Sequence, residues 1–289
     1  MTTNKNTLEH IIHGIFLLMG LVAVGCVLLI TVYLVISGIP AIIEIGLIDF
    51  LFGKEWASTA TDPKYGIWAF ILTSIYGTAG AIVIGVPIGF MTAVYLSKIA
   101  SPKVKSMMQS AVSLLAGIPS VVYGLVGMLV LVPGIRKIFG VPDGASLLAA
   151  IIVLAIMILP SIIKMSITAL DAVPKEYEDA SLALGATPIE TYFKVSVPAA
   201  KSGIAAAVVL GVGRAIGEAM AVMMVAGNVP NMPDSIFQSV RFLTTAVSSE
   251  MAYSSGLQQQ ALFSIALVLF LFIMLINATL NFFLKRETE

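Results

Sequence analysis

The chain alternates long apolar runs with short polar connections, and the lengths of the runs predict its fold. A transmembrane helix needs about 20 consecutive, predominantly apolar residues. Six runs reach that length, and they cover about residues 15–36, 67–96, 107–132, 145–170, 202–226 and 261–284. This pattern predicts an all-α polytopic membrane protein with six transmembrane helices.

The basic residues of the connections predict the orientation, because cytoplasmic loops of membrane proteins are enriched in Lys and Arg. Ten basic residues lie at or near one side of the predicted membrane: Lys5, Lys98, Lys103, Lys105, Lys164, Lys175, Lys194, Lys201, Lys285 and Arg286. Five lie at the other side: Lys54, Lys64, Arg136, Lys137 and Arg241. This bias places both termini and the connection after the fourth span in the cytoplasm. Lys164, near the end of that span, is expected to snorkel to the same surface.

The composition agrees with a membrane protein and excludes other classes. Hydrophobic residues make up 58% of the chain, charged residues make up 11%, and the mean hydropathy is +1.01. A soluble domain of this length carries more charge than that. The formal net charge is zero, which argues against a nucleic-acid-binding protein. Asp, Glu and His are too few and too scattered to predict an active site or a metal site.

The longest polar stretch, residues 173–198, reads VPKEYEDASLALGATPIETYFKVSVP. Its first half has helix signals, since Pro174 suits the first helical position, the first turn is acidic and Gly185 fits a C-terminal stop. Its second half begins with a predicted capping box at Thr187-Pro188-Ile189-Glu190 and ends at Pro198. Two short helices joined by a corner predict a rigid elbow at the cytoplasmic membrane surface.

Small residues and prolines predict how the spans pack. Gly85 and Gly89 form a small-xxx-small pair that lets another helix approach closely. Pro119 and Pro160 are expected to interrupt the third and fourth spans, and the carbonyls that they free need other partners. The small residues of the third span are spaced to share one stripe of a continuous helix: Ser113, Gly117, Ser120, Gly124 and Gly127.

The first external segment, residues 37–66, has two interpretations. The acidic residues and Trp56 among its apolar positions suit an interfacial helix plus a loop, with Trp56 at the level of the lipid headgroups. A solvated loop that only connects the first two spans explains the same residues equally well.

Two charged residues lie inside the fifth span. Arg214 is twelve residues past Ser202, which places it about 18 Å along the helix, near the bilayer midplane. Glu218 follows one turn later, on the same face of a continuous helix. Burying a lone charge at this depth costs roughly several kcal/mol of free energy, so the two residues are expected to pair or to face a polar cavity. An arginine there could bind an oxyanion, and a structural ion pair is the alternative.

The chain has no nucleotide-hydrolysing motif of its own. The glycines around Arg214 have the spacing GxGxxxG with no preceding strand, which is not a dinucleotide fingerprint. No Gly-Lys-Ser/Thr sequence occurs, since the only Gly-Lys, Gly53-Lys54, is followed by Glu55. The energy for any transport must therefore come from a partner or from an ion gradient.

The elbow resembles the EAA loop of binding-protein-dependent ABC permeases. The triplet is Asp179-Ala180-Ser181, the fixed glycine is Gly185, and the hydrophobic-x-hydrophobic-Pro ending is Val195-Ser196-Val197-Pro198. The resemblance implies that the elbow is a coupling helix docked into a groove of a cytoplasmic ATPase, and the alternative is an amphipathic interfacial helix. The residues that it implies for docking are Glu178, Asp179, Ala180, Ser181, Leu184, Gly185, Ala186 and Thr187.

Beyond the elbow, the chain resembles the phosphate-specific (Pst) branch of these permeases and, within it, the C-type subunit. The stretches that carry this resemblance are Tyr65-Gly66-Ile67, Gly77-Thr78, Leu115 to Gly124, Gly213 to Ala221, Val225 to Asn228, Glu250 to Gly256 and Ala261-Leu262-Phe263. The C-type assignment also uses residues 52–56. Together the stretches cover most of residues 50–284.

This resemblance implies a type I ABC importer permease in the plasma (inner) membrane of a prokaryote. The implied partners are a sibling permease that completes a heterodimer, two ATPase subunits that bind ATP and Mg, and an extracytoplasmic phosphate-binding protein. The chain itself would bind no cofactor, and Arg214 and Glu218 would belong to the anion path. The implied domains are 1–66 (first helix and external segment), 67–284 (permease core with coupling loop 171–201) and 285–289 (cytoplasmic tail).

Two other functions remain open on the sequence. A permease for molybdate, tungstate or sulfate would share the elbow and differ in the motifs of the third and fifth spans. A stand-alone secondary transporter or channel could use Arg214 and Glu218 as an ion or proton site. Co-purification of an ATPase subunit separates the two ABC permeases from the stand-alone transporter.

Overall fold

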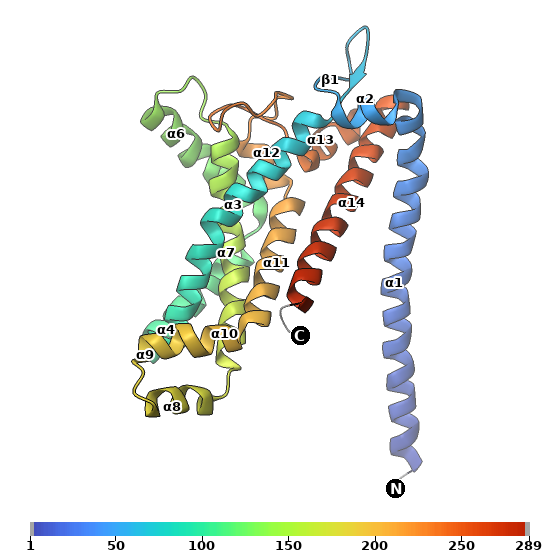
Figure 1. The fold of residues 1–289 in the computed structure, drawn as a ribbon. Helices are drawn as coiled ribbons and strands as arrows, with labels where there is room; N and C mark the ends of the chain where they lie inside the picture. The colour runs from blue at the N-terminus through green and yellow to red at the C-terminus, as the bar shows by residue number, and fades with distance from the viewer. Residues whose placement is uncertain (1–2, 287–289) are drawn as a thin grey trace.

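A computed structural model describes residues 3–286 and shows a helical bundle built around α7 (Leu147–Asp171) (Figure 1). Most residues of α7 are buried and most are apolar, as expected for a helix that other helices surround. Its main neighbours are α3 (Trp68–Val94), α11 (Lys201–Gly217) and α4 (Pro102–Gly117). The element that the sequence analysis assigned to the fourth span is therefore the centre of the fold.

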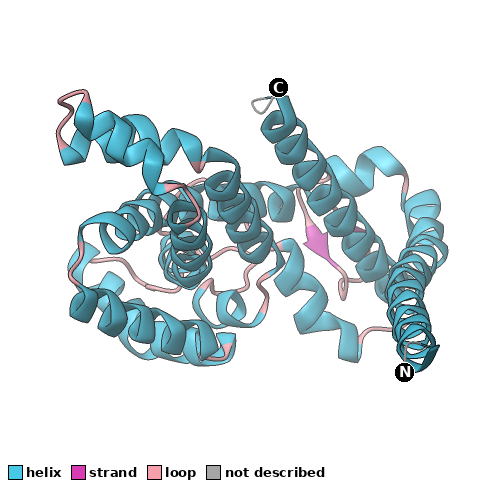
Figure 2. Ribbon diagram, turned by 90° about the horizontal axis from the view of Figure 1, so that it is seen from below, coloured by secondary structure: helices cyan, strands magenta, loops and turns pink. Residues whose placement is uncertain are grey.

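The described residues contain five helices that are long and apolar enough to span a membrane, and a sixth if one bent pair counts as one span. The bent pair joins residues 188–199 to α11 at an angle of 72°. The predicted number of spans is thus confirmed, although the third lies at Ser120–Phe139 instead of 107–132 and the fifth ends at Gly217 instead of 226. The first span is longer than expected, because α1 (Thr3–Ile45) continues well beyond residue 36. Figure 2 shows α1 at the edge of the molecule, beside the N-terminus.

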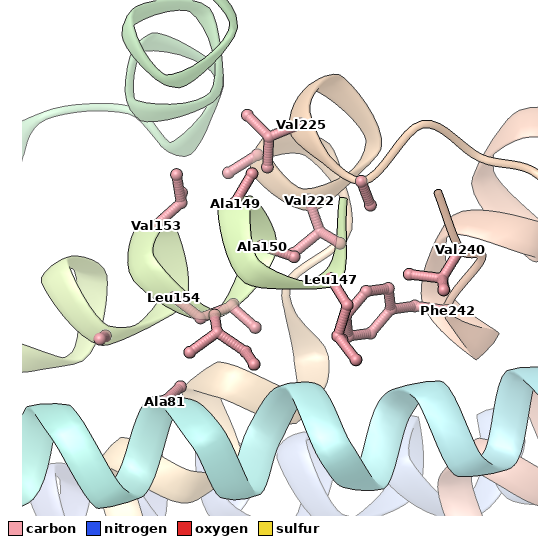
Figure 3. Close-up of a cluster of buried hydrophobic side chains, with 14 of the residues drawn as sticks. Ala81, Leu147, Ala149, Ala150, Val153, Leu154, Val222, Val225, Val240 and Phe242 are labelled. Carbon is pink, nitrogen blue, oxygen red and sulfur yellow. The ribbon is translucent and has the colours of Figure 1, made fainter. Parts of the chain in front are cut away.

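The close approach predicted for the second span is present between α3 and α7. A Cβ atom added to Gly85 would lie 2.7 Å from Ile158, and one added to Gly89 would lie 2.9 Å from Ile162. Larger side chains would push the two helices apart. At their external ends, α3 and α7 form an apolar cluster with the segment before α13 (Leu243–Glu250). Phe242 of that segment lies against both helices (Figure 3).

The third span is not the continuous helix that its small residues suggested. α4 ends at Gly117, and Ile118 and Pro119 are extended. The chain then continues through α5 (Ser120–Val126), a π-helical turn η2 (Gly127–Leu131) and α6 (Val132–Phe139). The single stripe was therefore a wrong prediction, because the break changes the direction of the side chains.

The polar groups at this break find partners within the protein. The hydroxyl of Tyr123 donates a hydrogen bond to the carbonyl oxygen of Leu115 at 2.7 Å, so a carbonyl near Pro119 has the other partner that the sequence predicted. Gly124 still packs closely against α12 (Met220–Val225). Pro160 behaves differently, since α7 runs through it without a break. The interruption expected at Pro160 is not observed.

The external segment contains a short helix, as one of the two interpretations proposed. It comprises α2 (Leu47–Phe52) and a two-stranded antiparallel hairpin, β1 (Trp56–Ala57) and β2 (Lys64–Tyr65), in which Trp56 faces Tyr65. Trp56 is only 7% exposed, and its indole N–H donates to the Glu250 carboxylate. The placement of Trp56 among lipid headgroups was wrong, because its ring packs inside the protein.

The last helix, α14 (Gly256–Arg286), joins α1 to the bundle. The hydroxyl of Ser264 donates to the carbonyl oxygen of Gly38 at 2.5 Å, and the rings of Tyr33 and Phe263 meet edge to face. Residues 285 and 286 belong to α14, and residues 287–289 of the expected tail lie outside the described part.

Candidate functional site

The elbow consists of the two short helices that the sequence predicted, and it lies at the same end of the molecule as the N-terminus (Figure 1). The first is α8 (Lys175–Ala183). Gly185 follows it with φ of 87°, and its N–H donates to the carbonyl oxygen of Leu182, while the N–H of Ala186 donates to that of Ser181. These two bonds make a Schellman motif, which is a specific helix stop. Pro174 precedes α8 as its N-cap, one residue earlier than expected.

The second helix begins with the predicted capping box. The hydroxyl of Thr187 accepts from the Glu190 N–H, and the Glu190 carboxylate accepts from the Thr187 N–H at 3.1 Å. This backbone hydrogen bond, together with Lys194, lowers the pKa of Glu190 to about 2. The helix continues from α9 (Pro188–Thr191) through a π-helical turn η3 (Tyr192–Ser196) into α10 (Val197–Ala199). The carboxylate is charged at any physiological pH, so the cap persists.

A hydrogen bond fixes the two helices of the elbow to each other. The hydroxyls of Ser181 and Thr191 lie 2.9 Å apart, and Thr191 is fully buried. The Schellman motif and the capping box already fix the corner between them. The two helices therefore form one rigid unit.

One residue of the implied docking set points into the protein. The carboxylate of Glu178 forms an ion pair with the Lys98 ammonium at 2.6 Å and accepts from the Ser196 hydroxyl at 2.8 Å. The side chains of Lys98 and Glu178 are only 11% and 18% exposed. Burial acts to raise the pKa of Glu178, but the hydrogen bonds from Lys98 and Ser196 outweigh it and hold the pKa below its ordinary value. Glu178 thus attaches the elbow to the bundle.

The remaining face of the elbow is exposed. Asp179, Ala180 and Gly185 are open to solvent, and Leu184 is 90% exposed at the corner. An apolar side chain exposed to that extent on a rigid polar segment suits a protein interface. Other large apolar side chains of the elbow that are more than a third exposed are Tyr177, Leu182, Ile189 and Phe193.

A substitution at Gly185 tests whether the shape of the corner matters. Gly185→Val forces a β-branched side chain into a left-handed conformation, which costs about 1–2 kcal/mol. We expect weaker association with the cytoplasmic ATPase that the resemblance implies, measured by co-purification, in a chain that still inserts into membranes. Gly134→Val is the control, because Gly134 also has open space around it but no positive φ. Equal recovery of the ATPase with both variants would contradict a role for the corner.

The fifth span is interrupted between the two charged residues. α11 ends at Gly217, Glu218 is extended, and α12 begins at Met220. Arg214 and Glu218 therefore do not share a helical face, and they form no ion pair among the described residues. Of the two predicted alternatives, a pair or a polar cavity, the pair is not observed, because the continuous helix that would place both charges on one face stops at Gly217.

The break explains how each charge is stabilised without the other. Arg214 lies in the last turn of α11, where the helix dipole favours a cation. The Glu218 carboxylate accepts a hydrogen bond from the Ala221 N–H at 3.0 Å, in the first turn of α12, where the dipole favours an anion. The Thr244 hydroxyl donates a hydrogen bond to the Glu218 carbonyl oxygen, which gives this backbone group a partner at the helix break. Glu218 is therefore held by hydrogen bonds with Ala221 and Thr244 that do not involve Arg214.

Arg214 opens onto a cavity of about 670 Å³ between α7, α11 and α14. Its guanidinium is half-buried and donates from Nη1 to the Ser161 hydroxyl at 3.3 Å. Asn277 of α14 lines the same cavity. Sequence reasoning missed Ser161 and Asn277, although polar residues within apolar spans are a usable signal. The cavity can accept an anion that takes hydrogen bonds from a guanidinium, a hydroxyl and an amide.

A broken membrane helix with a central arginine and a capped cytoplasmic elbow define a membrane transport component. Comparison with known families makes this specific: the chain belongs to the binding-protein-dependent transport system inner membrane component family, whose sequence profile matches residues 85–287. It is a multi-pass inner membrane protein and a permease subunit of an ABC transporter.

Individual relatives agree with this family. The probable ABC transporter permease protein YqgH of Bacillus subtilis (strain 168) is 41% identical over 266 residues, which cover 89% of this chain and 86% of the relative. The phosphate transport system permease protein PstC of Pasteurella multocida (strain Pm70) is 33% identical over 242 residues, with 77% and 75% covered.

The fold has a solved counterpart. A bacterial alginate ABC transporter, crystallised with an alginate pentasaccharide-bound periplasmic protein, contains a chain that superposes with a TM-score of 0.61 at 16% identity. The match covers 95% of this chain and 94% of that chain. It confirms the predicted type I permease fold.

Proposed function

We propose that this chain is the membrane-spanning permease subunit of an ATP-driven importer of inorganic phosphate. The observation that carries the proposal is the guanidinium of Arg214, which faces an open cavity without a carboxylate partner in the described residues. A planar fork of N–H donors suits a tetrahedral oxyanion. The relative from Pasteurella multocida, named as a phosphate permease, supports phosphate as the anion.

The proposed assembly contains a sibling permease, two ATPase subunits and an extracytoplasmic phosphate-binding protein. ATP and Mg²⁺ bind to the ATPase subunits, and this chain binds no cofactor. The exposed face of the elbow, from Asp179 to Thr187, docks on an ATPase subunit in the helix-in-groove manner. The sibling permease covers the side of the Arg214 cavity that is open in the isolated chain.

The proposed mechanism is alternating access around the cavity. Closure of the ATPase dimer pushes on the elbow, whose capped helices transmit the push as one body. Glu178 passes the movement to Lys98, at the cytoplasmic end of the helix that continues α3. The cavity then opens to the outside and accepts phosphate released by the binding protein.

Co-purification of the tagged full chain tests the class of transporter. We expect an ATPase subunit and a second permease to be recovered with it, and phosphate-loaded binding protein to stimulate ATP hydrolysis by the reconstituted complex. Recovery of the chain without any ATPase, together with uptake that follows an ion gradient, would instead support a stand-alone transporter. Stimulation by molybdate- or sulfate-loaded binding protein but not by the phosphate-loaded protein would support the other oxyanions.

A further inference from the structure

α7 presents one exposed stripe between α4 and α11. Ser161, Lys164, Met165 and Thr168 are spaced i, i+3, i+4 and i+7, so they share one side of the helix. Lys164, Met165 and Thr168 are exposed and Ser161 is half-buried, whereas the residues between them are buried. The stripe begins where Arg214 donates to Ser161 and runs from there towards the cytoplasmic end of α7.

A groove lies on the cytoplasmic side of the Arg214 cavity, and we call it the α4–α7 groove. It encloses about 300 Å³, and its polar lining is Gln109 and Ser113 from α4 with Lys164 and Thr168 from α7. A shallower depression of about 510 Å³ continues it along α4 and adds Ser106 and Ser110, of which the Ser110 hydroxyl donates to the Ser106 carbonyl oxygen.

The direction of the groove follows from how α4 lies on α7. At the cytoplasmic end, the Lys105 ammonium pairs with the Asp171 carboxylate at 2.9 Å. Higher up, Gln109 and Ser113 face Lys164 across the groove. The two helices are thus antiparallel, and the groove leads from the level of Lys164 to the cytoplasmic surface.

Lys164 is the only cation that lines this groove, and its ammonium has no ion pair or hydrogen-bond partner in the described part of the chain. It lies seven residues before Asp171, the last residue of α7, and therefore about 10 Å from the end of the helix. Val112, Ile163 and Ile167 also line the groove, and the methylene stem of Lys164 can lie along them. The Gln109 amide and the Ser113 hydroxyl in the same lining need water or a polar ligand.

The geometry points to the α4–α7 groove as a second oxyanion site, in which Lys164 receives the anion from Arg214 and releases it to the cytoplasm. This inference rests on the proposed function and extends it to the exit of the path. The ammonium is a strongly hydrated point charge on a flexible stem, and Gln109 and Ser113 supply neutral donors. The Thr168 hydroxyl donates to the Lys164 carbonyl oxygen at 3.0 Å, so it lines the groove without offering a donor. Such a site holds an anion less firmly than a guanidinium fork, which suits release, since conduction through successive sites needs weak binding at the last one.

Cysteine labelling tests the electrostatic part of this inference without any transport assay. In the full reconstituted complex carrying Cys26→Ser, Thr168→Cys is exposed to anionic and to cationic methanethiosulfonate reagents from the cytoplasmic side. Mass spectrometry of the peptide that contains residue 168 measures the two rates. We expect the anionic reagent to be favoured, inorganic phosphate to slow it, and Lys164→Met to lower the rate ratio at least about fivefold, the effect of one unit charge at about 4 Å in water.

Lys103→Met is the matched control, because Lys103 is exposed at the beginning of α4 and does not line the groove. It should leave the rate ratio unchanged. No labelling of residue 168 from the cytoplasm, or a ratio that Lys164→Met does not change, would overturn the inference.

Uptake measurements separate this inference from the proposed function. We expect Lys164→Met to lower the initial rate of phosphate uptake about tenfold at equal amounts of assembled complex, and Lys164→Arg to restore most of it. If the unchanged complex transports phosphate and Lys164→Met transports it equally well, the second site is wrong and the phosphate importer stands. If the unchanged complex transports no phosphate, the proposed function fails, and the labelling experiment still decides whether the groove attracts anions.

Discussion

Arg214→Gln is expected to abolish phosphate uptake and to leave the complex assembled. The guanidinium provides the only positive charge in the central cavity among the described residues, and glutamine keeps a donor without that charge. Each hydrogen bond to a charged group is worth about 1.5–3 kcal/mol, so the loss of a forked contact is enough to remove detectable transport. The hydrogen bond from Arg214 to Ser161 is a single 3.3 Å contact, which makes a small contribution to folding.

The measurement is uptake by vesicles normalised to the recovered complex. Arg136→Gln is the matched control, because Arg136 is exposed on α6 at the external end and should tolerate the same change. Arg214→Lys separates charge from shape: we expect it to recover only part of the uptake, since an ammonium lacks the planar fork. Normal uptake by Arg214→Gln would remove Arg214 from the anion path.

Glu178→Gln is expected to have the second largest effect, on the coupling between ATP hydrolysis and transport. The Lys98–Glu178 ion pair is nearly buried, and it connects the elbow to the helix that continues α3. Removing one partner of a fully buried pair costs about 3–5 kcal/mol, and the residual exposure of 11% and 18% reduces this penalty here. We expect a lower thermal stability and at least a tenfold fall in phosphate transported per ATP hydrolysed.

A charge exchange makes the Glu178 prediction specific. Lys98→Glu combined with Glu178→Lys should recover part of the coupling that each single change loses. Lys194→Met is the control, because its ion pair with Glu190 is exposed and is worth little. An unchanged ratio of transport to hydrolysis in Glu178→Gln would show that the elbow acts through other contacts.

The same ion pair predicts a pH dependence of stability. The folded pKa of Glu178 lies below its ordinary value of 4.5, so the contribution of the pair is present above that value and is lost as the pH falls through the folded pKa. We therefore expect the difference in thermal stability between the unchanged chain and Glu178→Gln to be constant near neutral pH and to shrink below about pH 4.5. A difference that grows on acidification would contradict this assignment.

Local signals predicted the elbow almost residue by residue. A capping box and a glycine stop depend on contacts within five residues of the chain, and both Thr187–Glu190 and Gly185 adopt the conformations that these signals specify. The number of spans was equally accessible, because the length of an apolar run is a property of the sequence alone.

The breaks in the third and fifth spans were harder to predict. Both spans are largely apolar on either side of the break, and glycine, proline and charged residues like those at the breaks also occur inside continuous helices, so they do not by themselves mark where a helix stops. The interruption predicted at Pro119 is observed, with Ile118 extended, because the residue before a proline disfavours the helical conformation. The same rule fails at Pro160, where α7 continues without a break between its neighbouring helices.

The direction of individual side chains depends on tertiary structure. Glu178 and Asp179 are adjacent acids on one helix, and the sequence alone does not show that Glu178 faces Lys98 while Asp179 faces solvent. In the same way, Ser161, Arg214 and Asn277 come from three separate helices and line one cavity. Pairings over such sequence distances require the fold.

The most direct test of the central claim is phosphate uptake by vesicles that contain the full complex, with ATP supplied to the cytoplasmic face and arsenate, sulfate and molybdate as competitors. The account predicts uptake that needs ATP hydrolysis and that arsenate alone inhibits, because arsenate matches phosphate in shape and charge. Uptake that follows an ion gradient without ATP, or that sulfate or molybdate suppresses equally, would contradict a phosphate-specific ABC importer.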